Sequence, residues 1–272
     1  MIIMQIALWS NQNVTAGVST LAVMLSSMIA VRGNHKTFLS HPMLKDQSLE
    51  SYLLSDKERE RYNDMGETGA DGLFRLLKNG RLEADSIKDY SYSLLSRSNL
   101  DFLCSKRLYE EMNEHYNNYT YLLRKANDFY DVSVIDLNVE LEHPLFYQTL
   151  KESDVFIIVV PQNKYLLMEL LNVLTKEKDR LRQLNLHIQL VMHPYNHESA
   201  MTLKQLLKPH KIKSPMTINY DTSIIDACNR SQLFDYCLRE AGFKGHRRKK
   251  CFSQMDDLVD LVMQWCQEVS YV

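Results

Sequence analysis

The sequence predicts an α/β fold, with a doubly wound, mostly parallel sheet and helices on both faces. Two observations predict it: several short segments are apolar along their whole length, and segments with helical spacing alternate with them. Strands buried on both faces are apolar throughout, and their alternation with helices is typical of parallel sheets. No repeat and no Pro-, Gly- or Ser-rich linker interrupts the pattern, so we expect residues 1–272 to form a single domain.

The first half of the chain alternates in this way from its start. The apolar run 2–9 predicts a buried strand, and residues 16–31 predict a helix because apolar side chains recur on a helical period. Short apolar runs predict strands at 36–39 and 100–103, and short helices are expected at 72–79 and 83–89 around Asn79-Gly80. A helix is expected over 108–127, whereas the charged stretch 57–67 has no clear apolar face.

The second half continues the alternation. The runs 131–137 and 154–160 are strongly apolar and predict strands, as do 186–192 and 216–218. Helices are expected at 164–184, 201–207, 231–241 and 255–269. Ligands of such sheets bind at the carboxyl ends of the strands, which makes the loop after the first strand the first place to examine.

Composition excludes several classes of protein. The chain has 32 Lys and Arg against 34 Asp and Glu, so no overall basicity points to nucleic acid. Its five cysteines have irregular spacing and no CxxC pair, which argues against a disulfide framework or a zinc ribbon and favours a reducing cytoplasm. Residues 1–8 lack the features of a signal peptide, and 21–31 is too short to span a membrane.

The loop after the first strand has the context of a phosphate-binding P-loop, GxxxxGK[ST]. Residues Asn13 to Thr20 read NVTAGVST, so Gly17 and the Ser19-Thr20 pair are in place. Val18 stands where the lysine is expected. With only 8 glycines, the chain is also poor in the residue on which phosphate-binding loops depend.

Motifs along nearly the whole chain resemble those of the ParA/MinD family, P-loop ATPases with a deviant Walker A motif. The matching segments are IALWS and NVTAGVST with LAVML near the start, KTFLSHPM, NLDFL, YDVSVID ending at Asp136, SDVFIIVVP, VMHPYN, and NYD followed by ACN. The resemblance implies the same fold. It also implies a nucleotide site at Asn13, Gly17, Val18, Ser19, Thr20, Asp136 and His193, with Ser19 and Asp136 as the Mg²⁺ contacts.

The sequence differs from this family at the positions that bind and hydrolyse the nucleotide. The two lysines of the family's loop correspond to Asn13 and Val18, and the acidic residue of its second strand corresponds to His41. The aspartate that follows it corresponds to Met43, and the asparagine that contacts the base corresponds to His193. Phosphoryl transfer depends on positioning and charge stabilisation, so we expect slow hydrolysis or none, and weak or no binding of ATP or ADP with Mg²⁺.

Ordinary structural roles remain open for the same residues. Ser19 and Thr20 suit the first turn of a helix, and Asp136 suits a turn or helix cap. His41 and His193 more often form structural hydrogen bonds, and no Cys/His cluster accompanies them.

A cationic run is the sharpest charge feature. Lys244, Arg247, Arg248, Lys249 and Lys250 place five cations within seven residues, in an expected loop before the last helix. A solvated loop is one interpretation. The others are nonspecific DNA binding, contact with an anionic membrane surface, or an acidic protein partner.

The last expected helix has apolar residues at helical spacing and an acidic polar face that includes Asp256, Asp257 and Asp260. MinD ends in a membrane-targeting amphipathic helix, but an acidic face repels anionic lipid. Packing against the core or in a partner groove is therefore expected.

Two functions remain. The first is a non-catalytic homodimer that positions a larger assembly, most like the TadZ/CpaE branch that localises pilus or secretion machinery. It would be cytoplasmic, or recruited by partners to the membrane or a cell pole. Because a strand is expected from Ile2, we expect no receiver-like domain ahead of it, unlike many members of that branch. The alternative is an active partition or septum-placement ATPase that takes a cation from outside the P-loop and binds DNA through residues 244–250.

Overall fold

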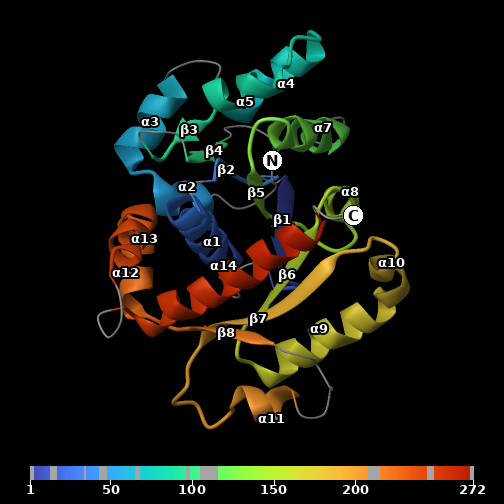
Figure 1. Ribbon diagram of the computed structural model, residues 1–272, viewed down its shortest axis with the longest axis vertical. Coiled ribbons are helices and arrows are strands. Elements are labelled where there is room, and N and C mark those ends of the chain that lie inside the picture. Colours follow the sequence, from blue (N-terminus) through green and yellow to red (C-terminus); the bar gives the residue numbers. More distant parts are fainter. Residues whose placement is uncertain are drawn as a thin grey trace.

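Eight strands form one twisted sheet at the centre of the computed structural model (Figure 1). The structure describes residues 3–12, 17–33, 35–42, 48–64, 68–95, 99–104, 116–207, 215–243 and 248–269. The strands are β1 (Met4–Trp9), β2 (Thr37–Ser40), β3 (Tyr92–Ser93), β4 (Leu100–Phe102), β5 (Val132–Asp136), β6 (Val155–Val160), β7 (His187–Tyr195) and β8 (Met216–Asn219). Their order across the sheet is β3-β4-β2-β5-β1-β6-β7-β8. Every pairing is parallel except that of β3 with β4.

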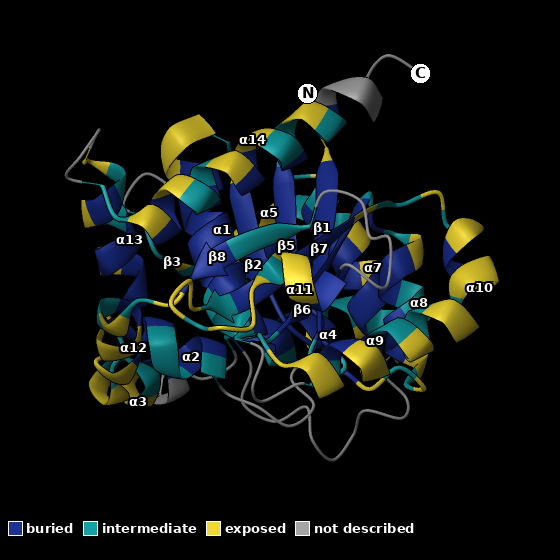
Figure 2. Ribbon diagram, turned by 90° about the horizontal axis from the view of Figure 1, so that it is seen from below, coloured by how far each residue is buried: buried dark blue, intermediate teal, exposed yellow. Residues whose placement is uncertain are grey.

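Helices pack on both faces, and each face has its own buried core (Figure 2). The first core is covered by α1 (Val18–Gly33), α2 (Ser48–Leu53), α3 (Asp56–Asp64), α12 (Thr222–Asn229), α13 (Leu233–Ala241) and α14 (Lys250–Val269). The second is covered by α4 (Gly69–Lys78), α5 (Ala84–Tyr90), α7 (Tyr116–Asn127), α8 (Pro144–Lys151), α9 (Lys164–Lys176), α10 (Lys178–Arg182) and α11 (Leu203–Leu207). The predicted doubly wound, mostly parallel fold is therefore confirmed.

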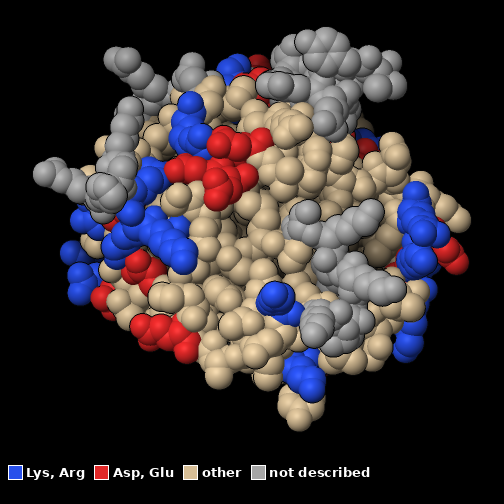
Figure 3. All heavy atoms as spheres, turned by 60° about the horizontal axis from the view of Figure 1, so that its bottom comes forward, with Lys and Arg blue, Asp and Glu red and all other residues tan. Residues whose placement is uncertain are grey.

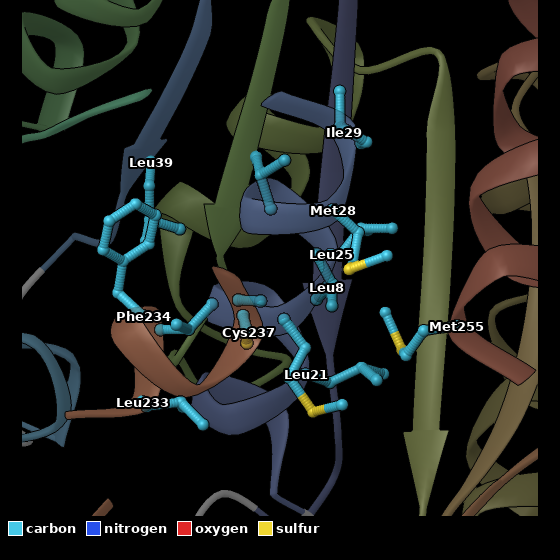
Figure 4. Packing of buried hydrophobic residues seen from close by; sticks show 14 of the residues in the cluster. Leu8, Leu21, Leu25, Met28, Ile29, Leu39, Leu233, Phe234, Cys237 and Met255 are labelled. Carbon is cyan, nitrogen blue, oxygen red and sulfur yellow. The ribbon is translucent and has the colours of Figure 1, made fainter. Parts of the chain in front are cut away.

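Helix α1 is buried almost all round and forms the middle of the first core. Figure 4 shows its leucines and methionines among Leu8 of β1, Phe234 and Cys237 of α13, and Met255 of α14. A helix that is apolar on every side is typical of such a central position. The burial fixes the start of α1 against the carboxyl end of β1, where the P-loop is expected.

Several predicted boundaries were wrong. The helix expected over 164–184 is two helices, because the chain turns at Glu177, whose carboxylate accepts a hydrogen bond from the Tyr147 hydroxyl and pairs with Arg180. The charged stretch around 57–64 is helix α3, and α2, α8 and α12 are helices that the sequence pattern did not predict. The helix expected at 255–269 begins earlier, at Lys250, and the part of the helix expected over 108–115 lies outside the described residues.

The apolar face of α14 packs on the sheet, as predicted. Met255, Leu258 and Val262 are fully buried, and the Trp265 ring stacks on His187 with ring centroids 4.9 Å apart. Its acidic side is partly neutralised, because Arg32 of α1 pairs with Asp256 at 3.1 Å and with Asp260 at 2.9 Å. No helix in the described part of the chain is both long enough and apolar enough to cross a membrane.

Candidate functional site

The predicted P-loop lies between β1 and α1 at the carboxyl edge of the sheet. Asn13 lies outside the described residues. Gly17 has φ +65°, a left-handed conformation that favours glycine, and its carbonyl accepts the first hydrogen bond of α1 from the Leu21 amide at 3.0 Å. The helix N-terminus therefore begins directly at this glycine, with its free amides at the sheet edge.

Ser19 and Asp136 meet at this edge, as predicted from the resemblance. Asp136 ends β5 and lies beside Leu8 in the pairing of β1 with β5. The Ser19 hydroxyl donates a hydrogen bond to Asp136 Oδ2 at 2.5 Å. Hydroxyl and carboxylate oxygens are the kind of ligand that Mg²⁺ takes, so this pair fits a magnesium ion. The structure brings the two residues together, and their role as Mg²⁺ contacts stays a prediction.

The neighbouring predicted residues face inward. Val18, at the position of the family's lysine, is 5% exposed and belongs to the first core. The Thr20 hydroxyl lies 4.0 Å from Cys228 Sγ of α12. Burial raises the pKa of Cys228 to about 11, so this thiol stays protonated and unreactive near neutral pH. All five cysteines are free and buried.

His193 of β7 lies against the P-loop glycine. A Cβ atom on Gly17 would come 2.9 Å from Cδ2 and 3.0 Å from Nε2 of this imidazole. The ring is 5% exposed, and its Nδ1 lies 3.3 Å from the Ile218 carbonyl oxygen. Burial lowers the pKa of His193 to about 4. His193 is therefore neutral near pH 7 and does not replace the missing lysines.

The segment from the start of the sequence through most of α1 contains no charged side chain. The first charged residue in the sequence is Arg32, at the far end of α1. A nucleotide at this edge would meet amide and hydroxyl groups of the loop, but no lysine from it.

His41 is paired away from this edge. Its Nε2 lies 3.0 Å from Glu50 Oε1 of α2, both side chains are buried, and its ring stacks on Phe102. The pair joins the end of β2 to α2. Sequence reasoning missed Glu50, because a single glutamate in a short segment carries no signal of burial. Met43 lies outside the described residues.

Trp9 and Gln12 are further residues of the edge that the sequence did not single out. Trp9 Nε1 donates to the Val139 carbonyl at 2.9 Å, which ties the end of β1 to the segment after Asp136. Gln12 Nε2 donates to Glu169 of α9 at 3.2 Å. The first contact fixes the end of β1, and the second joins the loop that follows β1 to α9.

Two cations of the basic run have partners within the protein. Arg248 Nη1 donates to the carbonyls of Glu240 at 2.8 Å and Phe243 at 3.1 Å, and the guanidinium pairs with Asp256 at 2.7 Å. Lys249 Nζ lies 3.0 Å from Asp221 and 2.7 Å from the Ser223 hydroxyl.

Lys250 is exposed in the first turn of α14 rather than in a loop, and Lys244 and Arg247 lie outside the described residues. On the face shown in Figure 3, acidic and basic side chains lie beside one another, and much of the centre is uncharged. DNA or membrane binding by this run stays a prediction.

The described residues contain no group of three or more His, Cys, Asp and Glu side chains placed to hold a metal ion. The Ser19–Asp136 pair supplies one hydroxyl and one carboxylate, and its role as a Mg²⁺ contact stays a prediction.

The sheet order and the helices on both faces match the fold of ParA/MinD-type P-loop proteins. No protein-family model and no curated protein matches the chain at the level of sequence. Solved structures do match in fold. A ParA family ATPase from Chlorobium tepidum TLS has a TM-score of 0.73 at 14% identity, covering 94% of this chain and 97% of that one.

Two further structures were solved with nucleotide. MinD from Pyrococcus horikoshii OT3, complexed with Mg-ADP, has a TM-score of 0.68 at 15% identity and covers 95% of each chain. A putative plasmid partition protein from Borrelia burgdorferi B31, bound to AMPPNP, has a TM-score of 0.60 at 18% identity, covering 96% of this chain and 98% of that one. At these identities the likeness establishes the fold alone.

Proposed function

We propose that this chain is a non-catalytic or very weakly active protein of the ParA/MinD fold, which dimerises and positions a larger assembly. One observation carries the proposal. The edge keeps Gly17 and the Ser19–Asp136 hydrogen bond, while the sequence has asparagine at 13 and valine at 18 instead of the family's lysines. The scaffold of the site is retained without the charges that its chemistry uses.

The missing lysines bear directly on hydrolysis. A phosphoryl group in transfer carries negative charge on its oxygens, and cations that stabilise this charge supply most of the catalysis. Neutral His193 and buried Val18 provide none. Ser19 and Asp136 would hold Mg²⁺ if a Mg-nucleotide binds, and binding of ATP or ADP is then weak, through backbone amides and the dipole of α1.

The same loss favours dimerisation without nucleotide. In the ParA/MinD family, which this sequence resembles, two subunits dimerise face to face across their P-loops with ATP between them. Two copies of a lysine-bearing edge repel one another until nucleotide neutralises them, whereas no charged residue precedes Arg32 in this chain. We propose a dimer that forms without ATP and serves as a platform for protein partners, of the pilus or secretion type that the TadZ/CpaE branch localises.

The test combines sedimentation of the purified protein with a phosphate-release assay. We expect a dimer with or without ATP and Mg²⁺, and no phosphate release above the protein-free rate. The double variant Asn13→Lys, Val18→Lys should dimerise only with ATP. Val31→Lys is the matched control, since it adds a lysine to an exposed position at the other end of α1 and should leave the dimer unchanged.

A protein that stays monomeric at high concentration, with and without ATP, contradicts the dimer. Steady phosphate release contradicts the non-catalytic role and favours an active partition ATPase that takes its cation from elsewhere.

A further inference from the structure

The first turns of α9 carry the most exposed large apolar side chain in the described part of the chain. Tyr165 is 81% exposed, and Met168, one turn further along the same side of the helix, is 37% exposed. The side of α9 that packs on the second core is formed by Leu167 and Leu170, so the core does not depend on either exposed side chain. Single exposed apolar residues are common, but an aromatic ring beside a thioether is typical of contacts between proteins.

Two opposite charges flank this apolar pair. Lys164 and Glu169 are both exposed. At 3.6 residues per turn, the four side chains lie across one face of the helix in the order Lys164, Met168, Tyr165 and Glu169. Lys164 has no carboxylate partner among the described residues, and Glu169 Oε2 accepts a hydrogen bond from Gln12 at 3.2 Å. Residues five apart on a helix do not face one another, so the two charges do not neutralise each other within the chain.

This order of charges is self-complementary. A two-fold axis that runs through the apolar pair places the cation of one copy opposite the anion of the other, and the same contact then occurs twice. The tyrosine and methionine side chains lie on that axis and meet their own copies there. Exposed ion pairs contribute little to affinity, but like charges at the same positions oppose association, so such pairs decide which surfaces can meet.

The surroundings of this face are close to neutral. Gln162 ties the segment before α11 to the start of α9, because its side-chain amide donates to the Met201 carbonyl at 2.8 Å. That segment and α11 itself add one exposed charge of each sign, at Glu198 and Lys204. An apolar centre with balanced charges around it fits a second copy of the chain better than it fits DNA or an anionic membrane.

We propose that the face of α9 formed by Lys164, Tyr165, Met168 and Glu169 is a contact surface between two copies of this chain. The inference rests on the homodimer proposed above, and it adds the helix at which the two copies meet. The contact between Gln12 and Glu169 joins this face to the loop after β1, so the surface is continuous with the edge at which dimerisation is proposed.

Sedimentation of charge-reversal variants tests the contact. Lys164→Glu places two anions on each copy and Glu169→Lys places two cations, so either variant alone should raise the dimer dissociation constant about tenfold or more. An equimolar mixture of the two variants should dimerise as the wild type does, because both ion pairs then form between unlike copies. Two weakened variants whose mixture stays weak overturn the proposal, since a symmetric pairing of these positions requires the rescue.

Lys176→Glu is the matched control for the charge. It makes the same reversal at an exposed position in the last turn of the same helix, and it should leave the dissociation constant unchanged. Equal weakening by Lys164→Glu and Lys176→Glu would show an effect of net charge, and it would overturn the assigned face.

The apolar pair has a test of its own. Tyr165→Ser removes an exposed ring, so circular dichroism should show a folded protein while the dissociation constant rises about tenfold. Tyr121→Ser removes the same ring from an exposed position on α7 and should have no effect. A Tyr165→Ser dimer as tight as the wild-type dimer contradicts the proposed surface.

The two proposals fail in different ways. A wild-type dimer that none of the α9 variants weakens keeps the proposed homodimer and overturns the α9 surface. A wild type that stays monomeric at high concentration contradicts both.

Discussion

Two regions of the protein differ in their charged side chains. One is the P-loop edge, where the start of α1 at Gly17 and Ser19 meets the end of β5, and the other is the connection between α13 and α14. Beside Gly17, the described contacts join the Ser19 hydroxyl to the Asp136 carboxylate and bring the neutral His193 ring against the glycine, with no cation among them. At the connection, Arg248 and Lys249 are held by carboxylates and carbonyl oxygens. The P-loop segment therefore lacks the lysines that an ATPase of this fold uses. In the basic run, by contrast, Arg248 and Lys249 bind groups of the protein itself.

The pKa shifts follow this contrast. Burial alone dominates at His193 and favours the uncharged ring. Burial also opposes the charge of Lys249, but the nearby Tyr236 side chain and the Asp221 carboxylate, to which Nζ donates, outweigh it and raise the pKa of Lys249 to about 12. Lys249 thus keeps its charge although it is partly buried, because acceptors surround its ammonium group. Three measurements test the difference between the two regions.

The largest effect concerns the neutrality of His193. Its pKa is about 4 in the folded protein against 6.5 for the unperturbed group. As the pH falls from about 6.5 to about 4, the unfolded chain takes up a proton that the folded protein refuses, which lowers the free energy of unfolding by about 3 kcal/mol. Above pH 6.5 both states are neutral and the contribution is constant.

Urea unfolding over this pH range measures the effect as the difference between the wild type and His193→Gln, which lacks the titrating group. The variant should lose much less stability toward low pH. Equal slopes for the wild type and His193→Gln would show that the ring is charged in the folded protein.

The contact between Gly17 and His193 gives the next largest effect. Gly17 and Gly80 have nearly the same conformation, with φ +65° and +67°. A Cβ atom on Gly17 would meet the fixed His193 ring, whereas one on Gly80 would meet nothing within 4 Å. Both alanine variants lose about 1 kcal/mol through the left-handed backbone, and Gly17→Ala should lose about 2 kcal/mol more through overpacking.

Denaturant unfolding of the two variants tests this difference directly. The extra cost should shrink when Gly17→Ala is combined with His193→Ala, because the smaller side chain makes room. Equal losses for Gly17→Ala and Gly80→Ala would mean that the ring is not fixed against the loop.

The sequence predicted most of the fold, for a physical reason. Central strands such as β5 and β6 are apolar throughout because both faces are buried, and this pattern is visible in one chain. Helix α3 was missed because its sequence, DKERERYND, has almost no apolar face. A local signal was present: Ser55 and Glu58 form a capping box, with the Ser55 amide donating to Glu58 Oε2 at 2.8 Å and the Glu58 amide to Ser55 Oγ at 3.4 Å.

The candidate site was predictable only in part. The resemblance to the ParA/MinD family placed Gly17, Ser19 and Asp136 in one site, and the parallel pairing of β1 with β5 brings Asp136 to the end of β1. The contact of His193 with Gly17 and the pairing of His41 with Glu50 depend on side-chain packing between distant segments. The internal partners of Arg248 and Lys249 were hidden for the same reason, because a run of cations looks alike whether it is solvated or bound.

The smallest expected effect tests whether Arg248 is a tie rather than a surface charge. Its planar guanidinium reaches the carbonyls at the end of α13 and both oxygens of Asp256 together. Arg248→Lys keeps the charge but loses this fork, so the free energy of unfolding should fall by about 1 kcal/mol. Lys250→Arg is the control, since it makes the reverse exchange at the exposed start of α14 and should change little. If both exchanges are neutral while Arg248→Lys weakens binding to DNA or anionic vesicles, Arg248 belongs to a docking surface, and the contrast between the two regions fails at that residue.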